Sequence, residues 1–475
     1  MADRPNILLV VADQLAARAL PAYGNQVVRA PNLARLSDAG VVFERALCAS
    51  PLCVPSRASL LTGLLPSRTG AIDNAGELPA SVPTFAHVLR RLGYRTVLIG
   101  KMHFIGPDQL HGFEERPMTD VYPAGLDWIP DWNLGDDGRL PWYHDLRSVL
   151  GAGPVGSTLQ LEYDAEVVER ACAVLADPGP RPLLLVASFT HPHDPYEVPR
   201  EHWDRYADVE IDPPARPDPA GDPPTRRLRA MIGEGEVTEE QVLRARRGYY
   251  GAVSLVDDHL GRLLEHSSGD TIVIVTSDHG DMLGERGLWY KMAPFEDSIR
   301  VPLIVHAPKR LPARRVDEAV SLLDLAPTIA ALAGGTLEDV DGIALLNGDP
   351  PTRDLPIEYL AEGVRAAQVT IVRGTRKLIR SHGEPDLVYD VAEDPAERID
   401  LAGEPDREPL RHASESRWDL AALDAATRLS QRRRRLVAAA LAEGKTVKWD
   451  HREGSRRYID TGDDFWATLA RARRP

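Results

Sequence analysis

The chain has 475 residues, of which 43% are hydrophobic and 27% charged, and its formal net charge is −15. This length and apolar share allow a large buried core and exclude general disorder. The acidic balance argues against nucleic acid as the main partner, because phosphate binding needs a concentrated Lys/Arg surface.

The N-terminal apolar run 6–11 predicts the first strand rather than a targeting segment. It is too short for a signal peptide, and it leads to Asp13 instead of small residues suited to cleavage. No apolar run in the sequence approaches the roughly 18 residues of a membrane helix. The cysteines, Cys48, Cys53 and Cys172, form neither a disulfide framework nor a zinc spacing. We therefore expect a cytoplasmic protein without a membrane partner.

Five short runs rich in Val, Ile and Leu predict buried strands. They are apolar on both faces, which is typical of a sheet covered on both sides. Longer amphipathic stretches separate them, and the stretch 238–264 opens with Thr238 and Gln241 at capping-box spacing. The alternation predicts an α/β fold with a doubly wound, mostly parallel sheet. The predicted strands are 7–12, 96–99, 183–187, 271–275 and 303–305.

Two stretches rich in Pro and Gly punctuate the chain. The stretch 212–225 predicts an exposed loop that serves as a lid or a subunit contact, and 347–356 predicts the main domain boundary. We expect one domain over 1–348 and a smaller α+β subdomain over 349–475. The second part contains predicted strands within 368–380, a helix rich in Arg and Ala, and a C-terminal tail. The run Arg432–Arg435 in that helix predicts a solvated or subunit-contacting face.

Polar side chains follow four of the predicted strands. In open parallel sheets, ligands bind beyond the carboxyl ends of the strands. One such residue alone is more often a turn former or helix cap, but four strand ends together predict a single polar site. Its members are Asp13, Gln14, Lys101, His103, His193, Asp278 and His279.

Part of this group predicts a site for one divalent metal ion. Asp13, Gln14 and Asp278 offer oxygen ligands, which suit Ca²⁺, Mg²⁺ or Mn²⁺ better than zinc. His279 adds a nitrogen, which shifts the balance slightly towards Mn²⁺. We expect Ca²⁺ first, with Mn²⁺ and Mg²⁺ as alternatives.

The segment 53–63, which reads CVPSRASLLTG, predicts a helix that begins with a reactive residue. Pro55 suits the first turn of this helix and Gly63 its exit. Cys53 then lies at a helix N-terminus, where negative charge is favoured. This makes Cys53 a candidate nucleophile, with Arg57 able to hold an anion bidentately. The alternative is a buried structural cysteine beside a surface arginine.

The same segment resembles the signature of the sulfatases of the alkaline-phosphatase superfamily, in which the cysteine is oxidised after translation to formylglycine. The stretch 93–103, with GYRT and GKMH, resembles the second signature of that family. The resemblance covers nearly the whole chain, is strongest to the choline sulfatases, and implies an alkaline-phosphatase-like fold. It also extends over 51–53, 67–70, 104–115, 190–196, 278–292 and 431–436.

The resemblance implies a reaction scheme. Formylglycine at position 53 would be hydrated, contact the metal ion and attack sulfur in line. Cationic side chains would spread the charge of the sulfate oxygens, one histidine would protonate the departing alcohol, and another would help restore the aldehyde. The cationic side chains would be Arg57, Lys101 and Lys291. His193, helped by Lys291, would protonate the alcohol, and His103 would help restore the aldehyde.

The resemblance also implies a site for the choline ammonium group. Trp128, Trp132 and the run 142–144 could supply aromatic faces for a cation, or could simply pack their own loop down. The family also uses an acidic residue from the C-terminal tail of a neighbouring subunit. The candidates for it here are Asp463 and Asp464, although the stretch 458–466 departs from the family's pattern. The implied substrate-binding residues are Asn74, Trp128, His144 and Glu362.

Other functions remain open. Phosphonate monoester and phosphodiester hydrolases resemble the chain in the pairs Asp13-Gln14 and Asp278-His279 and also use formylglycine. They usually have Gly at the position of Ser56. An arylsulfatase would use the same site, and a binding protein would keep Cys53 unoxidised. For the preferred function, the expected partners are a small sulfate ester, a formylglycine-generating maturation enzyme and further copies of the chain in a homodimer or homotetramer.

Overall fold

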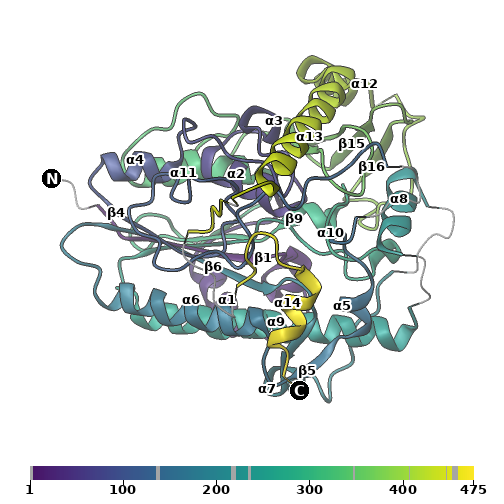
Figure 1. The fold of residues 1–475 in the computed structure, drawn as a ribbon. Coiled ribbons are helices and arrows are strands. Elements are labelled where there is room, and N and C mark those ends of the chain that lie inside the picture. The colour runs from purple at the N-terminus through teal and green to yellow at the C-terminus, as the bar shows by residue number, and fades with distance from the viewer. Residues whose placement is uncertain are drawn as a thin grey trace.

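A seven-stranded sheet forms the centre of the computed structural model (Figure 1). The structure describes residues 4–134, 140–215, 221–233, 237–345, 348–405, 407–445, 447–451 and 458–474. In spatial order the strands of the sheet are β11 (Arg314–Val316), β2 (Val41–Phe43), β10 (Leu303–His306), β8 (Ile272–Thr276), β1 (Ile7–Asp13), β6 (Leu183–Pro192) and β4 (Arg95–Gly100).

The predicted strands are confirmed, and the central ones are parallel. β1 pairs in parallel with β6 and with β8, and β6 pairs in parallel with β4. β10 is antiparallel to both of its neighbours, β8 and β2. The sheet is therefore mostly parallel, as the sequence predicts, and the carboxyl ends of β1, β4, β6 and β8 meet at one edge.

Alternate residues of β1 enter two different cores, which explains its continuous apolar sequence. Leu8 and Val10 join one core, and Ile7, Leu9 and Val11 join the other. Among the helices that contribute to the first core are α1 (Pro31–Ala39), α6 (Leu159–Ala176) and α9 (Glu239–His266). Among those of the second are α2 (Cys53–Thr62), α4 (Phe85–Arg91) and α11 (Leu325–Leu332).

The helix starts follow the local signals in the sequence. Thr238 caps α9, and Gln241 completes the predicted capping box. The expectation of a loop throughout 212–225 is wrong at its end, because α8 (Pro223–Ile232) begins there. Asp222 accepts a hydrogen bond from the Thr225 N–H, and proline suits the first helical position. Residues 216–220 of this stretch lie outside the described residues.

The C-terminal part begins with a four-stranded antiparallel sheet. Its strands are β13 (Leu355–Tyr359), β14 (Gln368–Arg373), β15 (Arg376–Ser381) and β16 (Leu387–Asp390). Three helices follow, namely α12 (Arg407–Arg417), α13 (Leu420–Ala442) and α14 (Phe465–Ala472). Figure 1 shows α13 reaching back over the larger part of the molecule. Directly after α14, Arg473 pairs with Glu197. Asn347, where the predicted boundary stretch begins, lies outside the described residues, and the division at 348 stays a prediction.

The remaining elements are short. They are α3 (Pro66–Thr69), α5 (Arg147–Leu150), α7 (Arg200–Asp204), α10 (Glu296–Ile299), β3 (Ala46–Leu47), β5 (Gly153–Val155), β7 (Glu197–Pro199), β9 (Arg300–Val301) and β12 (Val320–Ser321), with 3₁₀ turns η1 (Ala17–Ala19), η2 (Pro21–Tyr23), η3 (Glu285–Gly287) and η4 (Leu322–Asp324). Within the described residues, none of the helices has the length and apolarity that a membrane span requires.

The prediction of a solvated or subunit-contacting face for Arg432–Arg435 is half wrong. Arg432 and Arg433 are exposed. Arg434 pairs with Asp73, and Arg435 pairs with Asp131. These two guanidinium groups therefore contact the N-terminal part of the same chain. Successive side chains of a helix point in different directions, so neighbouring arginines of one run can face solvent and the protein surface respectively.

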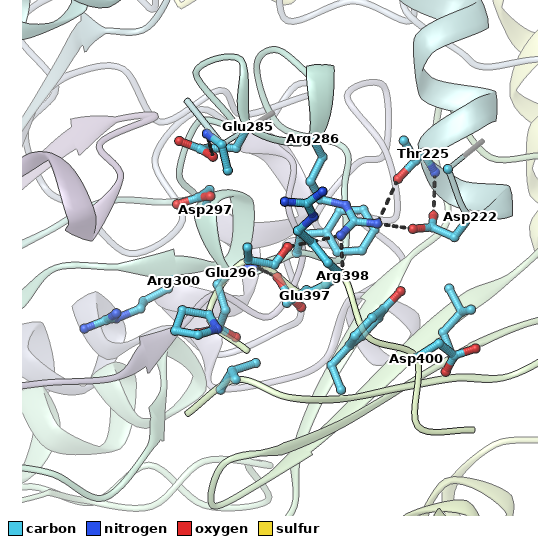
Figure 2. A pocket seen from close by; sticks show the side chains of 18 of the residues that line it. Asp222, Thr225, Glu285, Arg286, Glu296, Asp297, Arg300, Glu397, Arg398 and Asp400 are labelled. Atoms are coloured by element: carbon cyan, nitrogen blue, oxygen red, sulfur yellow. Dashed lines mark hydrogen bonds and ion pairs between the residues drawn. The ribbon is translucent and has the colours of Figure 1, made fainter. Parts of the chain in front are cut away.

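A large polar cleft lies where β16 and the segment after it meet residues 285–300 (Figure 2). It has a volume of about 600 Å³. Figure 2 shows Arg286 in the cleft, directed towards Asp222 and Thr225.

Candidate active site

The first acidic residue of the site stands at the end of the central strand. β1 ends at Asp13, which is fully buried, and Gln14 after it has a left-handed φ of 64°. Arg57 Nη2 lies 2.8 Å from Asp13 Oδ2, and Lys101 Nζ also pairs with that oxygen. Burial raises the pKa of Asp13, but Lys101 and Arg57 outweigh it and hold that pKa well below its ordinary value. Asp13 is therefore a carboxylate.

Cys53 is the first residue of α2, as the motif predicts. Gly63 ends the helix with a left-handed φ of 73°. The Cys53 Sγ lies 3.2 Å from His279 Nε2 and 3.6 Å from Lys101 Nζ. Burial, with Asp13 nearby, raises the pKa of Cys53 to about 12. The unmodified thiol is therefore neutral and a poor nucleophile.

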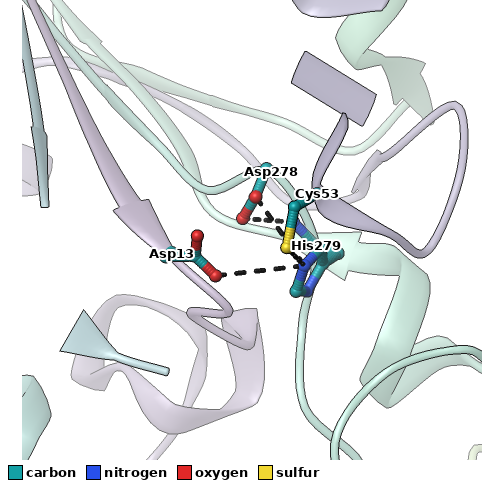
Figure 3. A group of neighbouring side chains, drawn as sticks. All are labelled: Asp13, Cys53, Asp278 and His279. Atoms are coloured by element: carbon teal, nitrogen blue, oxygen red, sulfur yellow. Dashed lines mark hydrogen bonds and ion pairs between the residues drawn. The ribbon is translucent and has the colours of Figure 1, made fainter. Parts of the chain in front are cut away.

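Four side chains are arranged closely enough to hold a metal ion (Figure 3). One ligand atom from each of Asp13, Cys53, Asp278 and His279 lies within 4.8 Å of the others. Asp13 Oδ1 is buried and has no hydrogen-bond partner among the described residues, so a lone pair remains available to a cation. Two carboxylates and an imidazole fit a divalent ion, while the structure does not select among Ca²⁺, Mn²⁺ and Mg²⁺.

Gln14 lies at the edge of this cluster. Its backbone N–H donates to Asp278 Oδ1 at 3.1 Å, while its side-chain Oε1 accepts from Lys291 Nζ at 2.6 Å. Its Nε2 donates to Asp281 Oδ2 at 2.7 Å. These contacts place the side-chain oxygen against an ammonium group, and its role as a metal ligand stays a prediction.

Arg57 holds the two metal-site carboxylates in place. Its Nε donates to Asp278 Oδ2 and its Nη2 to Asp13 Oδ2, both at 2.8 Å. Its Nη1 donates to the Lys101 carbonyl at 2.7 Å and to Ser188 Oγ at 2.9 Å. Four donor contacts of a fully buried guanidinium are thus committed to the protein, which favours a positioning role. Binding of an external anion by Arg57 stays a prediction.

Lys291 and His193 form a second group across the site. Lys291 Nζ lies 2.6 Å from His193 Nε2, and His193 Nδ1 lies 2.7 Å from the Asp194 carbonyl. Since the carbonyl can only accept, Nδ1 carries the proton and Nε2 accepts from the lysine. Burial and Lys291 together lower the pKa of His193 well below its ordinary value. The imidazole is therefore neutral and the proton resides on Lys291.

His103 faces the same space with both ring nitrogens free. Neither nitrogen has a hydrogen-bond partner among the described residues. Burial, followed by Lys101, lowers the pKa of His103 to about 3. The backbone at His103 has a left-handed φ of 59°, and Asp120 Oδ2 holds it by accepting the N–H groups of Met102 and His103, each at 2.7 Å. This neutral imidazole can accept a proton.

A narrow cavity joins Cys53 to all four predicted substrate-binding residues. Glu362 is buried in its wall, and neither carboxylate oxygen has a hydrogen-bond partner within the part of the chain described. Burial raises the pKa of Glu362 to about 7. The lining residues are Cys53, Asn74, His103, Tyr122, Trp128, Trp142, His144, His193, Lys291, Glu362, Phe465 and Trp466.

The structure separates the aromatic candidates. Trp128 and Trp142 line the cavity, whereas Trp132 is buried and donates from Nε1 to the Ala361 carbonyl at 2.8 Å. Tyr143 is likewise buried away from the lining. The prediction of an aromatic box is thus wrong for these two residues, because Trp132 packs in the hydrophobic core and Tyr143 packs against the Trp142 ring instead.

Sequence reasoning missed two aromatic residues of α14. Phe465 packs on Trp128 at a centroid distance of 5.8 Å, and the Arg147 guanidinium lies 3.8 Å from the Trp466 ring centre. Asp464, a candidate tail acid, instead caps α14 by accepting from the Ala467 N–H at 2.6 Å. The only sequence signal was the departure of 458–466 from the family's pattern. A role of Asp463 or Asp464 in a neighbouring subunit stays a prediction.

Comparison with known proteins identifies relatives over the whole chain. The family model described as Sulfatase matches residues 5–335, and the model of the C-terminal part of N-sulphoglucosamine sulphohydrolase matches residues 284–421. The choline-sulfatase of Rhizobium meliloti (strain 1021) is 43% identical over 491 aligned positions, which cover 96% of each chain.

Solved structures share the fold at lower identity. The phosphonate monoester hydrolase from Silicibacter pomeroyi is 24% identical with a TM-score of 0.69, over 96% of this chain and all of that one. The structure of BT4656 in complex with its substrate D-glucosamine-2-N,6-O-disulfate is 21% identical, also with a TM-score of 0.69, over 91% of this chain and 99% of the other. At these identities the likeness concerns the fold alone.

Proposed function

Since this chain belongs to the sulfatase family and is a sulfuric ester hydrolase, we propose that its substrate is choline sulfate, which it splits into choline and sulfate. The 43% identical relative that bears the name choline-sulfatase supports this substrate. The observation that carries the proposal is Glu362, an unpaired buried carboxylate in an aromatic cavity that also contains Cys53.

We propose that position 53 is converted to formylglycine by a maturation enzyme. The hydrated aldehyde would supply the nucleophile that the neutral thiol of Cys53 cannot be at ordinary pH. The divalent ion would be held by Asp13, Asp278 and His279, with Gln14 at the edge, and would supply Lewis-acid stabilisation of negative charge. Ca²⁺ remains the first expectation.

Lys101 and Lys291 are the cations best placed to face the sulfate oxygens. The ammonium of Lys101 lies beside the Cys53 Sγ, and that of Lys291 lines the same cavity. Arg57 contributes by ordering Asp13 and Asp278. Because these charges are fixed before the reaction, they stabilise developing negative charge without reorganisation.

The departing alcohol receives its proton from the pair formed by Lys291 and His193. The lysine carries the proton and the neutral imidazole accepts its hydrogen bond, so the histidine orients the ammonium and can relay the proton. His103, neutral and with two free nitrogens, serves as the base that takes a proton when sulfate leaves. Its position beside Cys53 in the cavity supports this role.

The choline ammonium would lie against Glu362 and the rings of Trp128 and Trp142. A quaternary ammonium cannot donate hydrogen bonds, so aromatic faces and an ionised carboxylate are the groups that recognise it. Asn74 and His144 complete this part of the cavity. The alternative functions are hydrolysis of a phosphonate monoester or phosphodiester and hydrolysis of an aryl sulfate at the same site.

The test compares three substrates with one enzyme sample. Mass spectrometry first measures conversion of Cys53, which lowers the mass by about 18 Da, so that rates refer to converted enzyme. We expect kcat/KM for choline sulfate to exceed that for p-nitrophenyl sulfate and for a phosphodiester by about 100-fold or more. A higher kcat/KM for the aryl sulfate or the phosphodiester would contradict the proposed substrate.

A further inference from the structure

A buried ion pair connects α13 to the wall of the active site. Arg434, in the third quarter of α13, places Nη1 2.5 Å from Asp73 Oδ1 and Nη2 2.6 Å from Asp73 Oδ2. Asp73 is fully buried, and the Arg434 side chain is 15% exposed. This bidentate geometry leaves neither carboxylate oxygen to solvent, so each partner depends on the other.

The residue after Asp73 acts on both the cavity and the start of α2. Asn74 lines the cavity, and its Oδ1 accepts the N–H of Val54 at 3.1 Å. The local N-cap position, Leu52, provides no side-chain acceptor. Asn74 therefore supplies from a distant loop the cap that α2 lacks, one residue away from Cys53.

The loop that carries Asn74 depends on Asp73 for its shape. Asp73 Oδ1 accepts the Ala75 N–H at 3.0 Å, and the Asp73 carbonyl accepts the Gly76 N–H at 2.9 Å. These local bonds form a turn, but they do not anchor it to the rest of the molecule. Arg434 provides that anchor from more than 350 residues away.

The same helix supports a second loop at the cavity. Gln431 Oε1 accepts the N–H of Trp132 at 3.3 Å. Arg435 pairs with Asp131 at 2.6 Å and donates to the Pro130 carbonyl at 2.5 Å. This loop directly follows Trp128, a wall of the cavity. The stretch 431–436 thus contacts the segments that bear two of the predicted substrate-binding residues, Asn74 and Trp128.

Charge gives the pair a further effect on the cavity. The negative charge of Asp73 adds to burial in raising the pKa of Glu362. Arg434 compensates this charge at its source. Loss of the guanidinium would leave Asp73 buried and uncompensated, close to the carboxylate that faces the cavity.

We propose that Arg434 is a positioning residue for catalysis: through Asp73 it sets Asn74 against both the substrate cavity and the first turn of α2. Helix α13 thereby fixes the arrangement of the nucleophile and the substrate-binding wall. The part that concerns choline rests on the proposed function. The contact chain from Arg434 to Asp73, Asn74 and Val54 does not depend on the identity of the ester.

A double-mutant cycle tests the proposal. The variants are Arg434→Gln, Asp73→Asn and the combination, with Arg434→Lys as the conservative variant and Arg433→Gln, exposed on the same helix, as the matched control. Each is assayed on choline sulfate and on p-nitrophenyl sulfate, with rates normalised to the formylglycine content and with melting temperatures measured.

We expect Arg434→Gln to lower kcat/KM about tenfold, mainly through KM, and Arg433→Gln to leave it unchanged. Arg434→Lys should fall between them because it keeps the charge but not the bidentate contact. The double variant should be more active than Arg434→Gln alone, since it removes the uncompensated carboxylate. If Arg434→Gln does not fold, recovery of folding and activity in the double variant supports the pair.

Three results would overturn the proposal. These are equal kcat/KM for Arg434→Gln and Arg433→Gln, additive losses in the double variant, and a loss that vanishes after normalisation to converted, folded enzyme. Failure of the proposed substrate is distinguishable: the wild type would hydrolyse p-nitrophenyl sulfate but not choline sulfate. The cycle would then be read on the aryl ester, with the same criteria.

Discussion

Two cavities in this molecule are lined by charged side chains, and they differ in how those charges are paired. In the large cleft, Arg18 contacts Glu285 at 2.8 Å and Asp297 at 3.0 Å, and Arg286 pairs with Asp222. Behind its wall, Lys377 is buried against Glu296. Charged side chains of the cleft thus form ion pairs with one another.

The cavity at Cys53 is much smaller, with about 30 Å³ against about 600 Å³ for the cleft by the same measure. Yet both ring nitrogens of His103 and both carboxylate oxygens of Glu362, which line it, are buried without hydrogen-bond partners among the described residues. An unpaired buried polar group costs folding free energy, so it persists where a ligand or a reaction uses it. The cleft also has buried atoms without hydrogen bonds, on Arg45, Arg286 and Glu397, but each of these side chains forms an ion pair. Side chains such as His103 and Glu362, in which no side-chain polar atom has a partner among the described residues, therefore mark the active site better than cavity size does. Substitutions in the two cavities should accordingly act on different quantities.

The largest expected effect is on activity, from Cys53→Ala. We expect kcat/KM to fall by at least about 10⁴-fold, because the nucleophile is lost, while the fold is retained. Steady-state kinetics and circular dichroism measure the two quantities. Cys48→Ala is the control, since Cys48 is equally buried but is not one of the four clustered ligands. Substantial turnover by Cys53→Ala would refute its role.

The next effect is on stability, from Lys377→Met behind the cleft. Its ammonium lies 3.2 Å from Glu296 and also pairs with Glu397, so its removal leaves buried acids uncompensated. We expect a loss of about 3–5 kcal/mol in the free energy of unfolding, measured in urea, with kcat/KM per folded molecule unchanged.

The exposed pair of Lys309 and Asp270 provides the control for this stability measurement. Lys309→Met should cost less than about 1 kcal/mol, as exposed ion pairs do. A fall in kcat/KM per folded molecule for Lys377→Met would show that the cleft contributes to activity, and the contrast between the cavities would fail.

The smallest effect concerns the pH dependence of Glu362. Its pKa of about 7 leaves it neutral below that pH and charged above it, so KM for choline sulfate should fall as the pH rises from 6 to 8. Glu362→Gln should remove this dependence and raise KM about tenfold at pH 8. KM for p-nitrophenyl sulfate should show neither effect.

The free energy of unfolding of the ligand-free protein should decrease with rising pH, whereas the affinity for choline sulfate should increase. The pKa of Glu362 is higher in the folded chain than its ordinary value of 4.5, so the folded state binds the proton more tightly. Stability of the ligand-free protein should therefore decrease as the pH rises from about 5 to 7, and this contribution should be absent in Glu362→Gln. An unchanged pH profile of the melting temperature in the variant would contradict the assignment.

Local sequence patterns were sufficient for the central strands of the sheet and for the chemistry at its edge, whereas the short strands β2 and β11 were not predicted. Continuous apolar runs predicted β1, β4, β6 and β8, and the residues that follow them converge because parallel strands end together. The capping box of α9 and the glycine that ends α2 were also predicted from the sequence. Each signal resides in a few neighbouring residues, whose conformational preferences act before tertiary packing.

The family resemblance contributed what spacing alone did not. Asn74, Trp128, His144 and Glu362 are far apart in the chain, and no periodicity brings them together. They nevertheless line one cavity with Cys53. The expectation came from similarity to a known family, and the common cavity is an independent observation in its favour.

The amino-acid sequence by itself determined the fold class, the helix that begins at Cys53 and the polar residues beyond the strands, because period, caps and motifs are local properties. Only the tertiary structure decided that Trp132 packs inward while Trp128 lines the cavity, that Phe465 and Trp466 join it, and that Arg434 pairs with Asp73. Those outcomes depend on packing and charge pairing between segments hundreds of residues apart. Which side chain finds a partner there is settled by the three-dimensional arrangement of the whole chain.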